Sequence, residues 1–164
     1  MSIAPPPRGS IANSAYWVAQ TRRINLAAGD AFVFLLFAFL GRLSHHETGA
    51  FDIGDAMWQT ILVAVPFALG WFAVAPFVGA FRRSRTDTPA RMVRTTLLAW
   101  LAAWPATLLL RWAFTGRVPP VSFAMVILLA NAVLLGLQRS AFVFWERMRA
   151  SWGDARLHTH ITNP

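Results

Sequence analysis

Four long apolar stretches alternate with short polar segments along this chain. They cover approximately residues 26–46, 57–81, 90–114 and 121–147. A helix rises about 1.5 Å per residue and the hydrocarbon core of a bilayer is about 30 Å thick, so each stretch is long enough to cross it. The short connecting segments place consecutive helices antiparallel. The pattern therefore predicts an all-α fold, namely a four-helix transmembrane bundle with antiparallel neighbours.

The polar ends of the chain lie outside this pattern. Residues 1–24 begin with a proline-rich run and lack the small-residue cleavage site of a signal peptide, so we expect a disordered cytoplasmic arm. Residues 25–147 form the predicted transmembrane domain. Residues 148–164 are polar and basic, and they form a predicted cytoplasmic tail.

Prolines fall inside the second and third apolar stretches. Pro66 lies near the middle of the second stretch, and Pro105 lies near the middle of the third. A proline inside a helix removes one backbone hydrogen bond and commonly bends the helix. We therefore expect helices two and three to be kinked at these residues.

The basic residues are distributed unequally between the two sides of the predicted bundle. All fifteen are arginines, and most belong to the first arm, the loop after the second helix and the final tail. Only Arg42, Arg111 and Arg117 belong to the opposite side. Because cytoplasmic loops are enriched in basic residues, both termini are predicted to be cytoplasmic. This topology describes a multi-pass protein of a prokaryotic cell membrane.

Composition narrows the possible classes of function. Hydrophobic residues make up 56% of the chain and charged residues 13%, which is unlike a soluble domain. Cysteine is absent, and no Ser-His-Asp arrangement, phosphate-binding glycine loop or His-Glu-x-x-His motif occurs. We therefore expect no enzyme, no metal and no cofactor. The formal charge of +8 indicates the cytoplasmic face of a membrane protein rather than a nucleic-acid partner.

Asp30 is an ionisable residue inside the first apolar stretch, near its predicted cytoplasmic end. An ionisable residue at membrane depth is a candidate functional site. One interpretation is structural: the start of the helix stabilises the carboxylate, or the carboxylate pairs with Arg94 or Arg139 near the same membrane face. The alternatives are a proton or cation relay and simple exposure at the interface. The sequence leaves these interpretations open.

A second polar cluster is expected on the outer side of the bundle. Arg42 and His45 are three residues apart and therefore share a helix face, and Arg111 should reach a similar depth. These residues either interact with the end of the helix and nearby carboxylates, or form an outward-facing pocket that binds an anion or titrates at His45. A metal site is the least favoured interpretation, because no complete ligand set has a recognisable spacing.

The fourth apolar stretch carries the residues expected to pack helices together. Asn131 and Gln138 are seven residues apart and share a face, where they are predicted to hydrogen-bond to neighbouring helices. Ala132, Gly136 and Ser140 form a stripe of small residues at four-residue spacing. Such a stripe lets another helix approach closely, including a helix of a second copy of the chain.

Several short motifs resemble those of a known family. They are Gly29-Asp30, Phe37-Ala38, Gly41-Arg42-x-Ser44-His45 and Pro66-Phe67-x-x-Gly70-Trp71. Together they resemble a small four-helix membrane family of actinobacteria, Chloroflexi and haloarchaea whose function is unknown, over roughly residues 29–139. The resemblance implies a four-span membrane domain, and it brings no reaction, ligand or catalytic residue.

The function that these sequence patterns favour is that of a non-enzymatic, small transporter-like or ligand-binding membrane unit. Its site would use Asp30 on the inner side and Arg42, His45 and Arg111 on the outer side. The alternative is a structural or accessory subunit of a larger membrane complex, in which the charges form ion pairs and the small-residue stripe meets a partner. The expected partners are the bilayer and either a second copy or another membrane protein. A transport site would require Asp30 and Arg42 to line one connected polar cavity.

Overall fold

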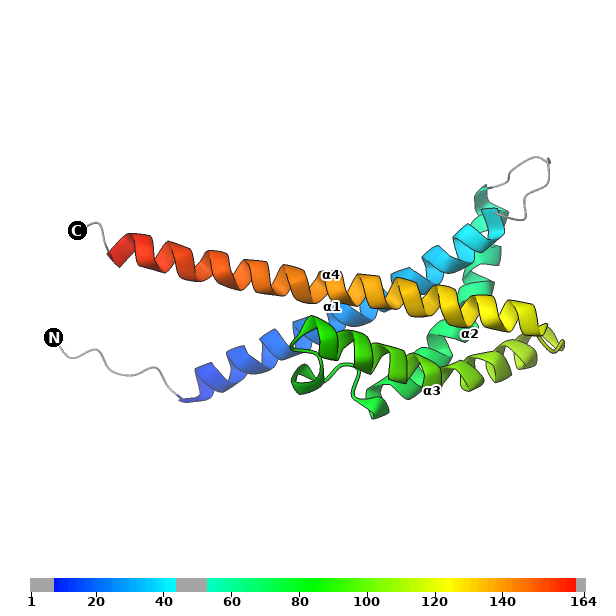
Figure 1. Ribbon diagram of the computed structural model, residues 1–164, viewed down its shortest axis with the longest axis horizontal. Coiled ribbons are helices and arrows are strands. Elements are labelled where there is room, and N and C mark those ends of the chain that lie inside the picture. The colour runs from blue at the N-terminus through cyan, green and yellow to red at the C-terminus, as the bar shows by residue number, and fades with distance from the viewer. Residues whose placement is uncertain (1–7, 44–52, 162–164) are drawn as a thin grey trace.

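The fold is all-α over the part of the chain that the structure covers. The computed structural model describes the backbone of residues 8–43 and 53–161, and the side chains of residues 16–43, 54 and 56–152. The elements in chain order are α1 (Arg8–Leu43), α2 (Ile53–Val78), a short 3-10 helix η1 (Arg83–Arg85), α3 (Pro89–Thr115) and α4 (Val121–Ile161). Figure 1 shows these helices as an elongated bundle.

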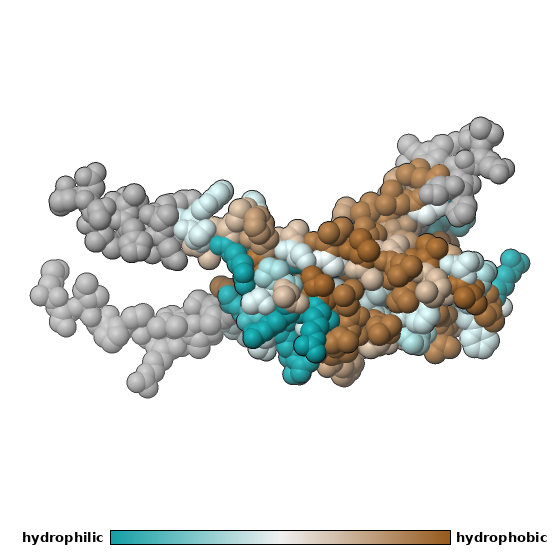
Figure 2. All heavy atoms as spheres, viewed as in Figure 1, coloured by the Kyte–Doolittle hydropathy of each residue, from teal (hydrophilic) through white to brown (hydrophobic). Residues whose placement is uncertain are grey.

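All four α-helices are long and apolar enough to cross a membrane. The qualifying segments are Tyr16–Leu43, Ala56–Val78, Pro89–Thr115 and Val121–Trp152. Large apolar side chains remain exposed along them, and Figure 2 shows this apolar surface as a broad brown area away from the α2–α3 connection. A soluble protein of this size rarely exposes so much contiguous apolar surface, whereas lipid tails cover it at no cost. The four apolar helices are those of a small membrane protein, as the sequence pattern predicts.

The helices are arranged so that α1 and α3 occupy opposite corners of the bundle. Within the described ranges, α1 packs against α2 and α4, and α3 packs against the same two helices. Figure 1 shows the start of α1 and the end of α4 at one end of the molecule, while at the other end α1 and α2 rise together away from α3 and α4. At the end that carries the α3–α4 turn, the four helices therefore separate into two pairs.

Aromatic rings fill the centre of the bundle. Phe34 of α1, Trp71 of α2 and Trp100 of α3 are buried, and their ring centroids lie 5.7 to 6.4 Å from one another. These separations suit tilted aromatic pairs. The indole N–H of Trp100 donates to the backbone carbonyl of Leu128 in α4 at 2.9 Å. This cluster therefore ties all four helices together at one level.

Helix α1 begins earlier than the apolar pattern indicates. It starts at Arg8, so residues 8–24 are helical where the sequence analysis expects a disordered arm. Part of this extension contacts α4, which itself continues to Ile161, although Figure 1 shows the two helices diverging toward the start of α1 and the end of α4. Arg22 of α1 is buried and pairs with Glu146 of α4. A polar segment therefore gains tertiary contacts that hydropathy alone does not reveal.

The connection between α2 and α3 is compact and determined by local signals. Helix α2 ends at a glycine, Gly79, which has a φ of +85° that other residues rarely adopt. Helix α3 begins with Thr88, whose side chain accepts a hydrogen bond from the N–H of Arg91 at 3.3 Å, and with Pro89 in the first turn. Both α2 and α3 continue through their internal prolines, and a bend at those residues stays a prediction.

Candidate functional site

An ion pair between Asp30 of α1 and Arg139 of α4 lies in the interior of the bundle. Both side chains have 0% exposed surface. The Nε of Arg139 donates to Oδ1 of Asp30 at 2.8 Å, and Nη2 of Arg139 donates to Oδ2. This is a bidentate arginine–carboxylate contact, the strongest common geometry for such a pair. Of the two partners that the sequence leaves open for Asp30, the structure selects Arg139.

Groups from α2 and from the residues just after it complete the hydrogen bonding of this pair. The indole N–H of Trp71 donates to Oδ2 of Asp30 at 2.9 Å, and Nη1 of Arg139 donates to the backbone carbonyl of Ala80 at 2.7 Å. The guanidinium also lies 4.9 Å from the ring centroid of Phe81 and 5.2 Å from that of Trp71. Buried charges are tolerated when they are paired and hydrogen-bonded in this way. Three separate segments thus converge on one charge pair.

Two glycines allow the backbones to come this close. A Cβ on Gly29 would lie 2.1 Å from the side-chain nitrogen of Gln138, so the residues that precede Asp30 and Arg139 also touch. The turn at Gly79 ends α2 and leaves the carbonyl of Ala80 available to Arg139. Glycine is the residue that permits both the close approach and the positive φ. The pair therefore depends on backbone geometry as well as on charge.

A second ion pair lies one layer away along the same two helices. Nε of Arg22 donates to both carboxylate oxygens of Glu146, at 2.9 and 3.1 Å. The other nitrogens of Arg22 donate to the hydroxyl and the backbone carbonyl of Thr86, at 3.1 and 2.9 Å. Arg22 is buried, whereas 35% of the Glu146 side chain is exposed. An apolar layer of Leu26, Met92 and Val143 separates this pair from the Asp30–Arg139 pair.

Two of the three predicted outer residues, Arg42 and Arg111, lie within the described part of the chain. Arg42 is half-buried near the end of α1, and Arg111 lies in α3, diagonally across the bundle from α1. The guanidinium of Arg111 lies 4.4 Å from the ring centroid of Phe123 and 5.9 Å from that of Phe67, which are favourable cation–π contacts. His45 falls outside the described residues. The outer pocket therefore stays a prediction.

The predicted packing residues of α4 behave differently from one another. Nδ2 of Asn131 donates to the carbonyl of Ile127 in its own helix at 3.1 Å, and not to a neighbouring helix as expected. The Oδ1 of Asn131 and the Oε1 of Gln138 are buried and have no hydrogen-bond partner among the described residues. Gln138 lies across Gly29 instead. Gln138 of α4 therefore packs against Gly29 of α1.

The small-residue stripe of α4 is not where the helices approach most closely. Ala132, Gly136 and Ser140 are half-buried, and a Cβ added to Gly136 would meet nothing within 4 Å. The close approach between α2 and α3 occurs at Gly70, where a Cβ would lie 2.5 Å from a side-chain carbon and 2.9 Å from the backbone nitrogen of Thr107. The described residues therefore leave room beside α4 at Gly136.

The sequence alone does not predict several of the contacts described above. Trp71 occurs in a quoted motif, but nothing in the motif says that its indole reaches Asp30. For the Arg22–Glu146 pair, the spacing of charged residues along each helix is the one feature of the sequence that could have indicated the contact. Arg22 precedes Asp30 by eight residues and Glu146 follows Arg139 by seven, so each helix repeats a charge on the same face.

The surroundings of the Asp30–Arg139 pair limit the chemistry that it performs. Hollows occur on the surface between α1 and α2, between α1 and α4, and beside the α3–α4 turn, and neither Asp30 nor Arg139 lines any of them. Within the described residues, no three His, Cys, Asp or Glu side chains gather as metal ligands. The pair is thus enclosed by protein and satisfied by protein groups.

Comparison with known proteins gives one match. A family model described as "Protein of unknown function (DUF3054)" matches residues 27–142. Searches of curated proteins and of solved structures returned no match. The matched range contains Asp30, Trp71 and Arg139, and it leaves out Arg22 and Glu146. The match confirms the resemblance to a membrane family of unknown function, and the chain belongs to the DUF3054 family.

Proposed function

We propose that this protein is a non-enzymatic structural or accessory unit of the membrane, in which a buried ion pair fastens the first helix to the last. The observation that supports this proposal is the complete enclosure of Asp30 and Arg139. A transport or relay site must exchange ions or protons with water, whereas a structural pair needs only to satisfy its own hydrogen bonds. Each group of this pair bonds to the other, and Trp71 of α2 and the carbonyl of Ala80 after α2 supply the remaining bonds.

An accessory role requires a surface for another membrane helix. The hollow between the outer halves of α1 and α4 suits that role, because it has a volume of about 530 Å³ and a lining of apolar and small residues. Gly41 lies in it, and a Cβ added there would meet nothing within 4 Å. Small residues that border open space let helices pack closely in lipid. The occupant is a second copy of this chain or another membrane protein.

The orientation that we propose has both ends of the chain in the cytoplasm of a prokaryotic cell. Arg82, Arg83 and Arg85 lie in the connection between α2 and α3, and Figure 2 shows a hydrophilic area there. This connection lies near the Arg22–Glu146 pair, because Thr86 bonds to Arg22. The excess of arginine at this end supports its assignment to the cytoplasmic side.

The transporter-like unit favoured by the sequence becomes the second candidate. One observation favours it: the side-chain oxygens of Asn131 and Gln138 are buried without hydrogen-bond partners among the described residues. Buried polar atoms of this kind commonly bind ordered water. Gln138 is also next to Arg139 in α4, so such water would lie close to the ion pair.

Two measurements test the proposal. Because the chain has no cysteine, Val133→Cys introduces a single thiol in the hollow between α1 and α4, and Leu109→Cys introduces one on the exposed face of α3 as a control. In native membranes, we expect Val133→Cys to form disulfide-linked dimers, or the protein to migrate with a larger complex on native gels. A protein that neither cross-links nor migrates above its monomeric mass would refute the accessory role.

The second measurement addresses transport directly. Liposomes that contain the wild-type protein or the Asp30→Asn variant are loaded with a pH-sensitive dye, and a proton gradient is applied. We expect no flux above that of empty liposomes for either protein. A flux that Asp30→Asn abolishes and that the exposed control Arg94→Gln retains would establish the transporter-like function instead.

A further inference from the structure

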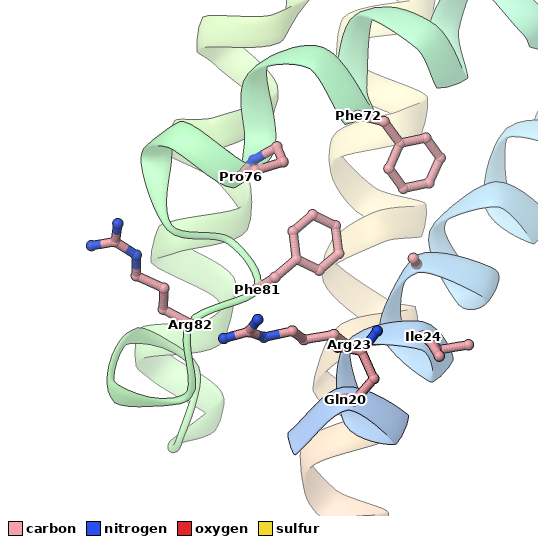
Figure 3. A pocket seen from close by; sticks show the side chains of 8 residues that line it. Gln20, Arg23, Ile24, Phe72, Pro76, Phe81 and Arg82 are labelled. Atoms are coloured by element: carbon pink, nitrogen blue, oxygen red, sulfur yellow. The ribbon is translucent and has the colours of Figure 1, made fainter. Parts of the chain in front are cut away.

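A groove with both apolar and basic residues lies between α1 and the end of α2. Its volume is about 550 Å³, within the range of small-molecule sites. Figure 3 shows the rings of Phe72 and Phe81 lying between the two helices, with the side chain of Arg23 extending beneath Phe81. The lining residues are Gln20, Arg23, Ile24, Ala27, Phe72, Pro76, Phe81 and Arg82.

The basic residues of this groove have no carboxylate partner within the described part of the chain. The acidic side chains that the structure describes are Asp30, Asp87 and Glu146, and each already pairs with another arginine. Arg23 and Arg82 are exposed and line the groove. An anion that neutralises them would have to come from outside these residues.

The walls of the groove indicate what kind of anion fits. Ile24, Ala27 and Phe72 form an apolar side, and the rings of Phe72 and Phe81 stack with centroids 6.4 Å apart. A free inorganic anion gains nothing from such a surface. A phospholipid has a phosphate for the arginines and an acyl chain for the apolar wall, so it matches both parts of the groove.

We propose that this groove binds one anionic phospholipid from the leaflet that faces the arginine-rich α2–α3 connection. The phosphate pairs with Arg23, whose side chain extends beneath Phe81, and Arg82 adds positive charge at the same end of the groove although its side chain points away from the groove in Figure 3. The side chain of Gln20 lies at the same edge for the polar headgroup. The acyl chain runs along α1 past Ala27 toward the centre of the membrane. This inference goes beyond the accessory role and does not depend on it, because any membrane protein can carry a lipid site.

The test uses the full-length protein in detergent and measures bound lipid by native mass spectrometry, with phosphatidylglycerol and phosphatidylcholine as probes. We expect preferential binding of one phosphatidylglycerol. The double variant Arg23→Gln/Arg82→Gln should weaken that binding by about 25-fold, at about fivefold for each basic residue near a lipid surface. The matched control Arg83→Gln/Arg94→Gln removes the same charge from exposed positions that do not line the groove, so it should retain most of the binding.

A third variant tests the apolar wall without changing charge. Ala27→Phe fills the groove from α1, so it should reduce phosphatidylglycerol binding at least tenfold. If the arginine double variant does not fold, the result with Ala27→Phe decides whether the groove binds the lipid. Three results would overturn the proposal: equal loss in the two double variants, equal binding of the two lipids, or unchanged binding in Ala27→Phe. Displacement of the lipid by millimolar inorganic phosphate would also overturn it, since the site would then recognise a free anion.

Discussion

Replacement of Asp30 by asparagine should destabilise the folded protein strongly. The variant keeps the size of the side chain but removes the negative charge, so Arg139 remains buried without its counterion. Breaking a buried ion pair by removing one partner costs about 3–5 kcal/mol, because the remaining charge is uncompensated. Arg139 retains its bond to the carbonyl of Ala80, and an asparagine oxygen still accepts one hydrogen bond. We therefore expect a loss near the lower end of that range, about 3 kcal/mol.

The assay is unfolding of purified protein in detergent micelles, followed by circular dichroism during heating and during titration with a denaturing detergent. For a chain of this length, a loss of 1 kcal/mol lowers the midpoint temperature by about 2–4 °C, so we expect a decrease of roughly 10 °C. Asp87→Asn is the matched control, because its carboxylate forms an exposed pair with Arg91 at 3.0 Å. Such surface pairs contribute about 0–1 kcal/mol.

The double variant Asp30→Asn/Arg139→Gln determines whether the two residues act as a unit. It removes both charges, so its stability should be close to or above that of Asp30→Asn alone, with a coupling free energy of about 2 kcal/mol or more. If the two single effects add to within about 0.5 kcal/mol, the pair is not energetically coupled and the structural reasoning is wrong.

Three further predictions use the same unfolding measurement. Trp71→Phe should cost about 1–3 kcal/mol, because it removes the indole donor to Asp30, and an unchanged midpoint would count against that bond. Gly70→Ala should cost about 1–3 kcal/mol, because its Cβ would lie 2.9 Å from a backbone atom of α3, whereas Gly136→Ala should be neutral or stabilising by up to about 1 kcal/mol. Glu146→Gln should cost no more than about 1–2 kcal/mol, since its carboxylate is partly exposed, and a larger loss than in Asp30→Asn would reverse this ranking of the two ion pairs.

The four apolar helices could be predicted because hydropathy and length determine which segments can cross a bilayer. The starts of α3 and α4, at Pro89 and Val121, lie within one residue of the expected positions. The start of α1 could not be found in this way. Residues 8–15 precede the apolar segment that begins at Tyr16, and the contact that ties Arg22 to Glu146 joins residues 124 positions apart, which an apolar pattern does not indicate.

The candidate site was only partly predictable for a related reason. The apolar pattern gives the depth of Asp30 in the membrane, and depth alone leaves Arg94 and Arg139 as equal partners. The choice between them depends on which helices are immediate neighbours, and α3, which carries Arg94, lies diagonally across the bundle from α1 and meets it through side chains such as Trp100. The outer cluster of Arg42, His45 and Arg111 was also predicted from depth alone, and it stays a prediction because His45 lies outside the described residues.

The two ion pairs together determine how α1 and α4 align. In lipid, apolar residues on helix surfaces discriminate weakly between alignments, because each alignment buries similar side chains against similar neighbours. Arg22 and Asp30 are separated by eight residues, about 12 Å, and Arg139 and Glu146 by seven, about 10.5 Å, so both pairs form in only one antiparallel alignment. A slip of one turn, about 5.4 Å, would leave two acids and two arginines unpaired. Because each helix carries one charge of each sign, a slip of about 11 Å would place Arg22 against Arg139 in one direction and Asp30 against Glu146 in the other, so the pairs favour a single register.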